Sequence, residues 1–238
     1  MKKRDNGYKL IQLLKQNPEK FHYAYQLYEE YACYNLELST LIELLHNEND
    51  IIRSIAINIC YDLSPSVWDE ITDEVILLLK DKNIHIVKYA LKIIATYPYE
   101  KNCLIPFSYL NHKDQEIRIT AMELFDSYSL STLKYMSEYF FYTNNLMYQE
   151  YISFLISSDK IDESEITQLM NSDNIIKQKL AIIIACKYPS KFKYLIQQDF
   201  KDDDIRRYIL EKTQLIILMT RMVIIMCCVY KIYDACSK

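Results

Sequence analysis

The sequence predicts an all-α protein, built as an α-solenoid of about seven helical hairpins in a right-handed superhelical stack. Three observations support this fold class. Apolar residues recur at helical spacing, a pattern of about 30 residues repeats along the chain, and the 238 residues include one glycine. Because the repeat runs through most of the sequence, we expect residues 1–238 to form a single repeat domain.

Each predicted unit is centred on one residue in the middle of an amphipathic run, such as NENDIIRSIAINIC at residues 47–60. Similar runs are DKNIHIVKYALKII, KDQEIRITAMELF and SDNIIKQKLAIII. Their alignment places the central residues, here called anchors, at Ala24, Ala56, Ala90, Ala121, Tyr151, Ala181 and Ile209. The spacings are 32, 34, 31, 30, 30 and 28 residues, which is typical of stacked helical repeats.

An Asn or Asp stands seven residues before every anchor. These residues are Asn17, Asn49, Asn83, Asp114, Asn144, Asn174 and Asp202. Their short side chains accept hydrogen bonds from the unpaired amides of a first helical turn. We therefore predict that each one is the N-cap of the second helix of its unit. Pro18 follows Asn17 at the position where a helix tolerates proline best.

Prolines and a second apolar segment complete each unit. Pro65, Pro98 and Pro189 lie eight or nine residues beyond their anchors, where proline ends a helix. Ahead of the caps run the shorter apolar segments LIELL, VILLL, PFSYL, MSEYFF, ITQLM and KYLI, which predict the first helices. The residues four positions before the anchors are expected on the same buried face: Ile52, Ile86, Ile117, Met147 and Ile205.

These units resemble HEAT repeats over roughly residues 8–215. The matching features are a short apolar first helix, an Asn/Asp turn, and a second helix such as IIRSIAINI or EIRITAMEL with a basic residue before the Ala. The fifth and seventh units lack the Ala. The resemblance implies a binding surface for another protein, and a small acidic array is similar to bacterial immunity proteins that neutralise a cognate toxin. A cytosolic scaffold or adaptor is the alternative that the same resemblance implies.

The composition argues against several classes of enzyme. Phosphate loops, dinucleotide loops and nucleophile elbows need glycines, and Gly7 is the one glycine of the chain. His22, His46, His85 and His112 are the four histidines, and His46 and His112 are predicted in turns two units apart, too distant to share a metal. We therefore expect no catalytic residue, no metal and no cofactor.

Nucleic acid is not the expected ligand, because the net charge of −4 comes from 28 basic and 32 acidic residues mixed along the chain. The enzymatic alternative that the resemblance implies is a HEAT-like DNA alkylation glycosylase, which uses a basic groove and tryptophans. Trp68, the single tryptophan, is instead expected to pack between units. Seven cysteines without CxxC spacing, and no N-terminal apolar signal, predict reduced thiols in the cytoplasm.

A strip of mixed charge on the second helices favours a protein partner held on the concave face. The predicted contacts are Lys88, Lys92, Arg118, Glu123, Asp126, Tyr148, Gln149 and Lys179. The 22 tyrosines add side chains that are enriched at interfaces. Basic residues recur three positions before the anchors, at Arg53, Arg118 and Arg206, and hydrogen bonds or ion pairs between units are the structural interpretation of these residues.

The tail LIILMTRMVIIMCCVYKIY, residues 215–233, is apolar enough to suggest a membrane span. Arg221 lies near its middle, where insertion costs about 2.5 to 3.5 kcal/mol. We therefore predict that residues 216–238 form a helix that caps the open end of the stack. A membrane anchor is the alternative.

Overall fold

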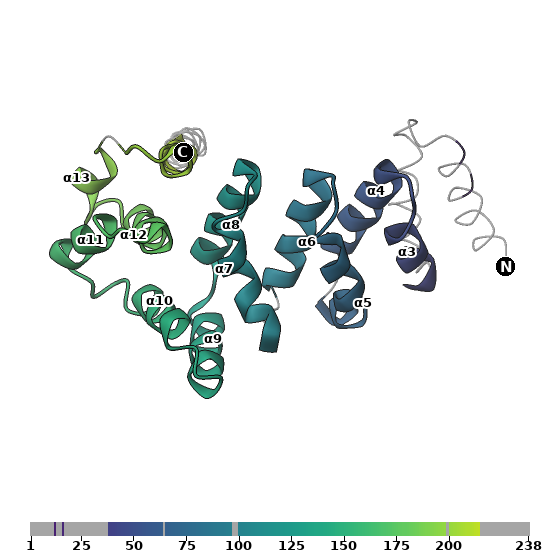
Figure 1. Ribbon diagram of the computed structural model, residues 1–238, viewed down its shortest axis with the longest axis horizontal. Coiled ribbons are helices and arrows are strands. Elements are labelled where there is room, and N and C mark those ends of the chain that lie inside the picture. The colour runs from purple at the N-terminus through teal and green to yellow at the C-terminus, as the bar shows by residue number, and fades with distance from the viewer. Residues whose placement is uncertain are drawn as a thin grey trace, which may run out of the picture. The chain divides into compact units, whose positions relative to one another are not determined.

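The computed structural model describes residues 12, 16, 38–63, 65–96, 100–198 and 200–214, and every regular element in these ranges is helical (Figure 1). The elements are α3 (Leu38–Leu45), α4 (Asp50–Tyr61), α5 (Pro65–Leu78), α6 (Ile84–Thr96), the 3-10 helix η1 (Glu100–Leu104), α7 (Ile105–Tyr109), α8 (Gln115–Ser127), α9 (Leu130–Tyr142), α10 (Leu146–Ile156), α11 (Glu163–Met170), α12 (Ile175–Lys187) and α13 (Lys193–Ile196). A further helix covers residues 203–214. The all-α prediction is therefore confirmed for the described part of the chain.

The six segments predicted as first helices lie in α3, α5, α7, α9, α11 and α13. The predicted second helices are α4, α6, α8, α10, α12 and the helix at 203–214. α4, α6 and α12 end at Tyr61, Thr96 and Lys187, before the prolines, and Pro65 begins α5. Ala24, Asn17, Pro98 and the predicted capping helix at 216–238 lie outside the described residues.

The predicted N-caps are confirmed at five of the six described positions. Side-chain oxygens of Asn49, Asn83, Asp114, Asn174 and Asp202 accept from backbone amides two or three residues later, at 2.9 to 3.3 Å. Each bond pairs an amide that the helix itself leaves unpaired, so the cap marks the start of the second helix.

The prediction at Asn144 is wrong, because this residue ends α9 instead of starting α10. Its φ of 56° is in the left-handed region, which Asn tolerates better than most residues. The Asn144 amide donates to Phe141 O at 3.1 Å and the Asn145 amide donates to Phe140 O at 2.8 Å. This pair of bonds is a Schellman motif, the usual end of a helix at a left-handed residue. Asn145 is the N-cap of α10, without a side-chain capping bond.

The anchors lie in the core. Ala56, Ala90, Ala121, Tyr151 and Ala181 are buried, and Ile209 is half-buried. Of the residues four positions earlier, Ile52, Ile86, Ile117 and Ile205 are buried as predicted.

Met147 is the exception, with 49% of its surface exposed, so its predicted place in the core is wrong. The next residue, Tyr148, packs there instead, with its ring centroid 5.6 Å from Phe140 and 6.1 Å from Tyr151. In α10 the aromatic ring of Tyr148, packed against other rings, therefore fills the position that Ile fills in α4, α6, α8 and the helix at 203–214.

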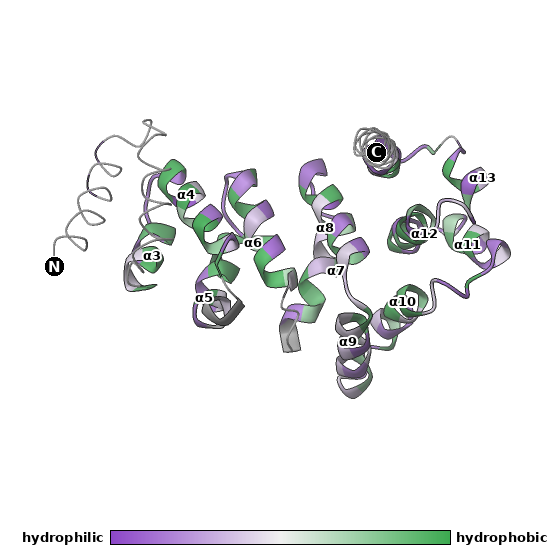
Figure 2. Ribbon diagram, turned by 180° about the vertical axis from the view of Figure 1, so that it is seen from behind, coloured by the Kyte–Doolittle hydropathy of each residue, from purple (hydrophilic) through white to green (hydrophobic). Residues whose placement is uncertain are grey.

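The chain divides into two compact units between Leu124 and Phe125, a point within α8. In the first unit α3 packs on α4, α5 packs on α6, α3 also contacts α5, and α4 also contacts α6. In the second unit α9 packs on α10, α11 packs on α12, and α10 contacts α12. Figure 2 shows α12 among the most hydrophobic helices, in accord with the continuous burial of its residues from Lys179 to Ala185. None of the described helices is long and apolar enough to cross a bilayer.

Candidate functional site

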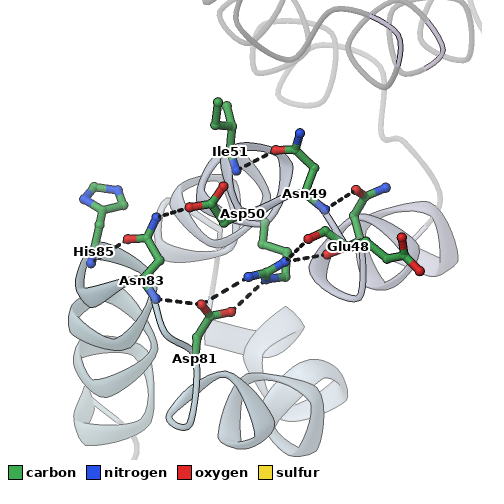
Figure 3. A network of polar contacts seen from close by, with 9 residues as sticks. Glu48, Asn49, Asp50, Ile51, Asp81, Asn83 and His85 are labelled. Carbon is green, nitrogen blue, oxygen red and sulfur yellow. Dashed lines mark hydrogen bonds and ion pairs between the residues drawn. The ribbon is translucent and has the colours of Figure 1, made fainter.

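The turn between α3 and α4 is built by a polar network centred on Arg53 (Figure 3). The Asn47 side chain accepts from the Asn49 amide at 2.9 Å, and Arg53 Nη1 donates to the carbonyls of Asn47 and Glu48 at 2.7 and 2.8 Å. Arg53 Nε and Nη2 also donate to the two carboxylate oxygens of Asp81, at 2.7 and 3.1 Å. One guanidinium therefore holds its own turn and the next turn together.

Asp81 occupies the matching place in the α5–α6 turn. It accepts from the Asn83 amide at 2.8 Å, while Asn83 Nδ2 donates to Asp50 at 2.9 Å. Burial acts to raise the pKa of the Asp81 carboxyl, but the hydrogen bonds and charge of Arg53 and the Asn83 amide outweigh it, so this pKa is lowered. The predicted link between Arg53 and an acidic residue of the next predicted helical hairpin is confirmed.

The same position serves the turn in other hairpins. Arg118 Nη1 donates to the carbonyls of His112 and Lys113 at 2.7 and 2.8 Å, and Gln178 Nε2 donates to Ser172 O at 2.6 Å. Arg118, predicted as a partner contact, is thus bound to its own turn. Arg206 forms an exposed ion pair with Asp203 on its own helix.

The histidines of the turns also have structural bonds. His112 Nδ1 accepts from the Asp114 amide at 3.1 Å, and His46 Nε2 contacts Glu74 at 2.5 Å. Among the residues that the structure describes, no group of three or more His, Cys, Asp or Glu side chains is placed to hold a metal ion.

Burial raises the pKa of the Cys60, Cys103 and Cys186 thiols to about 12. At Cys186 the charge of Asp126 adds to this rise and that of Lys212 opposes it. These thiols stay protonated at neutral pH, which is the unreactive form. Trp68 of α5 is buried and donates from Nε1 to Cys60 O of α4 at 2.7 Å, a contact between the helices of two successive predicted units.

The predicted partner contacts in the first compact unit lie on α6 and α8 and are half-buried. Lys88 Nζ pairs with Glu116 at 3.0 Å. Lys92 and Glu123 are half-buried, and neither has an ion-pair partner within the described residues.

In the second unit most of the predicted contacts are used internally. Asp126 pairs with Lys212 at 2.5 Å, Tyr148 packs among aromatic rings, and Gln149 is half-buried. Lys179 is 1% exposed and its Nζ lies 2.8 Å from Asp204, so its predicted place on an exposed strip is wrong. A carboxylate 25 residues away in sequence compensates the buried ammonium, which spacing within one helix does not reveal.

A cluster of four accessible side chains lies on α4 and α6, formed by Tyr61, His85, Tyr89 and Lys92; we call it the Tyr89 cluster. The Tyr61 ring meets the Tyr89 ring edge-on, with centroids 5.3 Å apart and an interplanar angle of 87°. The His85 ring lies 4.6 Å from the Tyr89 ring, and Lys92 Nζ lies 5.5 Å from its centroid. His85 Nε2 also contacts Asn58 Oδ1 at 3.1 Å. These contacts hold the cluster in one arrangement.

Two lysines of α6, Lys88 and Lys92, act on the His85 ring of the cluster. Burial lowers the pKa of His85, and the charges of Lys88 and Lys92 lower it further. Lys88 is neutralised in part by Glu116, whereas Lys92 is not paired within the described chain.

A second accessible surface, which we call the α9–α10 tip, carries Phe141, Tyr142, Leu146 and Met147. The first three are 61%, 83% and 61% exposed. No charged residue occurs between Glu138 and Glu150. Exposed apolar patches of this kind mark interaction surfaces on soluble proteins.

Sequence reasoning identified Lys88 and Lys92 but missed Tyr61, His85 and Tyr89. The spacing of His85, Tyr89 and Lys92 places them on one stripe of a helix and was available as a signal. Tyr61 belongs to the preceding second helix, and its position depends on how α4 packs against α6. No known family model matches the chain, and no curated protein sequence matches it significantly.

Proposed function

We propose that the protein is a non-enzymatic α-solenoid of HEAT-like hairpins that binds another protein. Support for the architecture comes from the alternating first and second helices and from polar contacts between neighbouring hairpins. His85–Asn58, Arg53–Asp81 and Asp50–Asn83 join residues 27, 28 and 33 positions apart, close to the repeat length. Contacts between hairpins that follow one another along the chain, at separations near the repeat length, are what a solenoid requires.

The Tyr89 cluster carries the proposed binding role. Tyrosine and a cation on an accessible helix face are the residue types that dominate binding energy at protein interfaces. Because the rings already contact one another in the free protein, little side-chain entropy is lost when a partner docks. Lys88, Lys92 and Glu123 stay in the proposed contact set, with Tyr61, His85 and Tyr89 added.

Within this class, the proposed role is that of a cytoplasmic immunity protein that neutralises a cognate bacterial toxin by direct binding. Its support is the resemblance to HEAT repeats, the net charge of −4 and the mixed charges of Lys92 and Glu123. A cytosolic scaffold or adaptor uses the same surface and is the alternative.

Photo-cross-linking in cells of the native organism tests the binding role. A benzophenone amino acid at position 61 should give a discrete protein adduct, and Tyr89→Ala should weaken it strongly. The same probe at Tyr194, an exposed residue of the second unit, is the matched control. Adducts that contain nucleic acid, or none above the control, would contradict a protein-binding function at this surface.

The toxin role has a separate test once the adduct is identified. Co-expression with the captured protein should rescue growth for the wild type and fail for a variant with Lys92→Glu and Glu123→Lys together. This double reversal should weaken binding by about 2 kcal/mol if the pair is desolvated in the complex. Its thermal unfolding should stay nearly unchanged, because both sites are on the surface. If the captured protein is not toxic, the scaffold alternative gains support.

A further inference from the structure

We propose that the Tyr89 cluster binds a carboxylate side chain of the partner, an Asp or Glu in an acidic segment, through Lys92. The inference deepens the proposed protein-binding function and rests on it. In this arrangement the ammonium of Lys92 pairs with the carboxylate, and the rings of Tyr61 and Tyr89 cover the apolar stem of the ligand side chain.

The first argument is the position of Lys92. Its Nζ lies 5.5 Å from the centroid of the Tyr89 ring, a cation–π contact that restrains the long side chain. Within the described residues it has no carboxylate partner, although Lys88, one turn earlier, is paired with Glu116. A restrained ammonium that lacks its counter-charge is arranged to receive a carboxylate with little loss of entropy.

The second argument is the charge around the cluster. Lys88 and Lys92 are four residues apart on one face of α6, where like charges repel each other. Burial lowers the pKa of the neighbouring His85, and the same two charges lower it further. Of the described acidic residues Asp62 after α4 and Glu116 and Glu123 on α8, Glu116 forms an ion pair with Lys88. An added carboxylate therefore relieves an existing repulsion.

The third argument concerns the class of ligand. Nucleic-acid binding draws its affinity from several lysine or arginine contacts to successive phosphates. This face offers Lys92, which has no ion-pair partner within the described residues, beside two tyrosines, in a chain of net charge −4. A single carboxylate with an apolar stem matches that arrangement, and an extended polyanion does not.

The experiment uses His85 as a reporter of charge in the full-length protein. Nuclear magnetic resonance follows the His85 ring during pH titrations, with its signal assigned by the variant His85→Gln. The probe is a blocked tetrapeptide of four glutamates, and the matched control is a blocked tetrapeptide of four glutamines. The glutamate peptide should raise the pKa of His85, because a nearby negative charge stabilises the imidazolium form. The glutamine peptide should leave it unchanged.

Variants separate binding through Lys92 from a general effect of charge. Lys92→Met keeps the length of the stem and removes the charge. It should therefore lower the affinity for the glutamate peptide by about threefold to fivefold, the effect of losing one accessible ion pair. Lys80→Met, an exposed lysine of the same unit, should bind the peptide like the wild type. Circular dichroism should show equal helicity for both variants.

Three outcomes would overturn the inference: an equal response to the glutamine peptide, unchanged affinity in Lys92→Met, or tighter binding of a single-stranded oligonucleotide than of the glutamate peptide. The cross-linking experiment at position 61 remains a separate measure of protein binding. If a partner is captured there and Lys92→Met does not weaken it, the binding function stands and the carboxylate assignment fails. If the peptide binds through Lys92 and no partner is captured, the carboxylate assignment stands and the protein-binding function fails.

Discussion

The α3–α4 and α9–α10 turns connect similar pairs of helices but are held together in different ways. In the α3–α4 turn, Asn49 caps α4 and Arg53 links the turn carbonyls to Asp81 of the next turn. In the α9–α10 turn the position equivalent to Arg53 is Tyr148, which packs on rings of the core, and Asn145 caps α10 without a side-chain bond. A polar network joins the first hairpin to its neighbour, whereas aromatic packing and a Schellman motif shape the second.

This difference shows that turns at equivalent places in the sequence pattern have different structural roles. Where a turn forms a polar network with the next turn, as α3–α4 does, its polar side chains bond to other residues of the protein. Where the turn ends in a left-handed Asn144, the flanking residues Phe141, Tyr142, Leu146 and Met147 are exposed. In these two turns, the residue three positions before the anchor is Arg53, which links two turns, or Tyr148, which packs on rings beside an accessible apolar tip.

The largest expected effect comes from removing the link at Arg53. Arg53→Met breaks the hydrogen bonds to Asp81 and leaves the carbonyls of Asn47 and Glu48 without this donor, so it should lower stability by about 2 to 3 kcal/mol. Chemical denaturation followed by circular dichroism measures the loss. The control Arg206→Ala removes an exposed ion pair within one helix and should cost about 0.5 kcal/mol or less. Equal losses of stability in the two variants would mean that the Arg53 network contributes no more than an exposed ion pair.

The caps provide the next comparison. Asn49→Ala removes the bond to the Ile51 amide and should cost about 1 kcal/mol. Asn145→Ala removes no capping bond and should cost clearly less. Asn144→Val places a β-branched residue in the left-handed region and should cost about 1 to 2 kcal/mol. Thermal unfolding of the three variants ranks them, and a cost at Asn145 equal to that at Asn49 would contradict the difference between the turns.

The Arg53–Asp81 link should also make stability depend on acid. The pKa of Asp81 is lowered in the folded protein, so its stabilising contribution is present above the unfolded pKa of about 3.9 and is lost as the pH falls through the folded value. Asp81→Asn should therefore reduce the loss of stability on acidification below about pH 4. Asp173→Asn, at an exposed residue of the α11–α12 turn, is the control and should follow the wild type. An acid profile of Asp81→Asn identical to that of the wild type would argue against the link.

The smallest effect on stability is expected at the α9–α10 tip. Tyr142→Ser removes an exposed ring and should change stability by about 0.5 kcal/mol or less. Phe140→Ser, two residues earlier in the core, should cost several kcal/mol and serves as the contrast. Comparable costs at the two positions would show that Tyr142 is packed and that the tip is not an accessible surface.

Local features of the sequence were sufficient to predict the helices and most of their starts. Apolar spacing is set within one or two turns, and an Asn or Asp cap bonds to amides two or three residues away, so both can be inferred without knowing the neighbours. The same locality explains the error at Asn144. An Asn fits both the end of one helix and the start of the next, and the length of the turn decides between them.

The candidate site depends on contacts between different helices, and the sequence alone did not predict which residues make them. The repeat period predicted that Arg53 would pair with an acidic residue. The sequence also predicted an exposed Lys179, whereas the fold buries this lysine in an ion pair with Asp204. Tyr61 and Tyr89 are 28 residues apart and form one surface only because α4 packs on α6. Helix formation is governed by short-range hydrogen bonds and side-chain spacing, whereas burial and charge pairing depend on which helices become neighbours, and that is decided by tertiary packing.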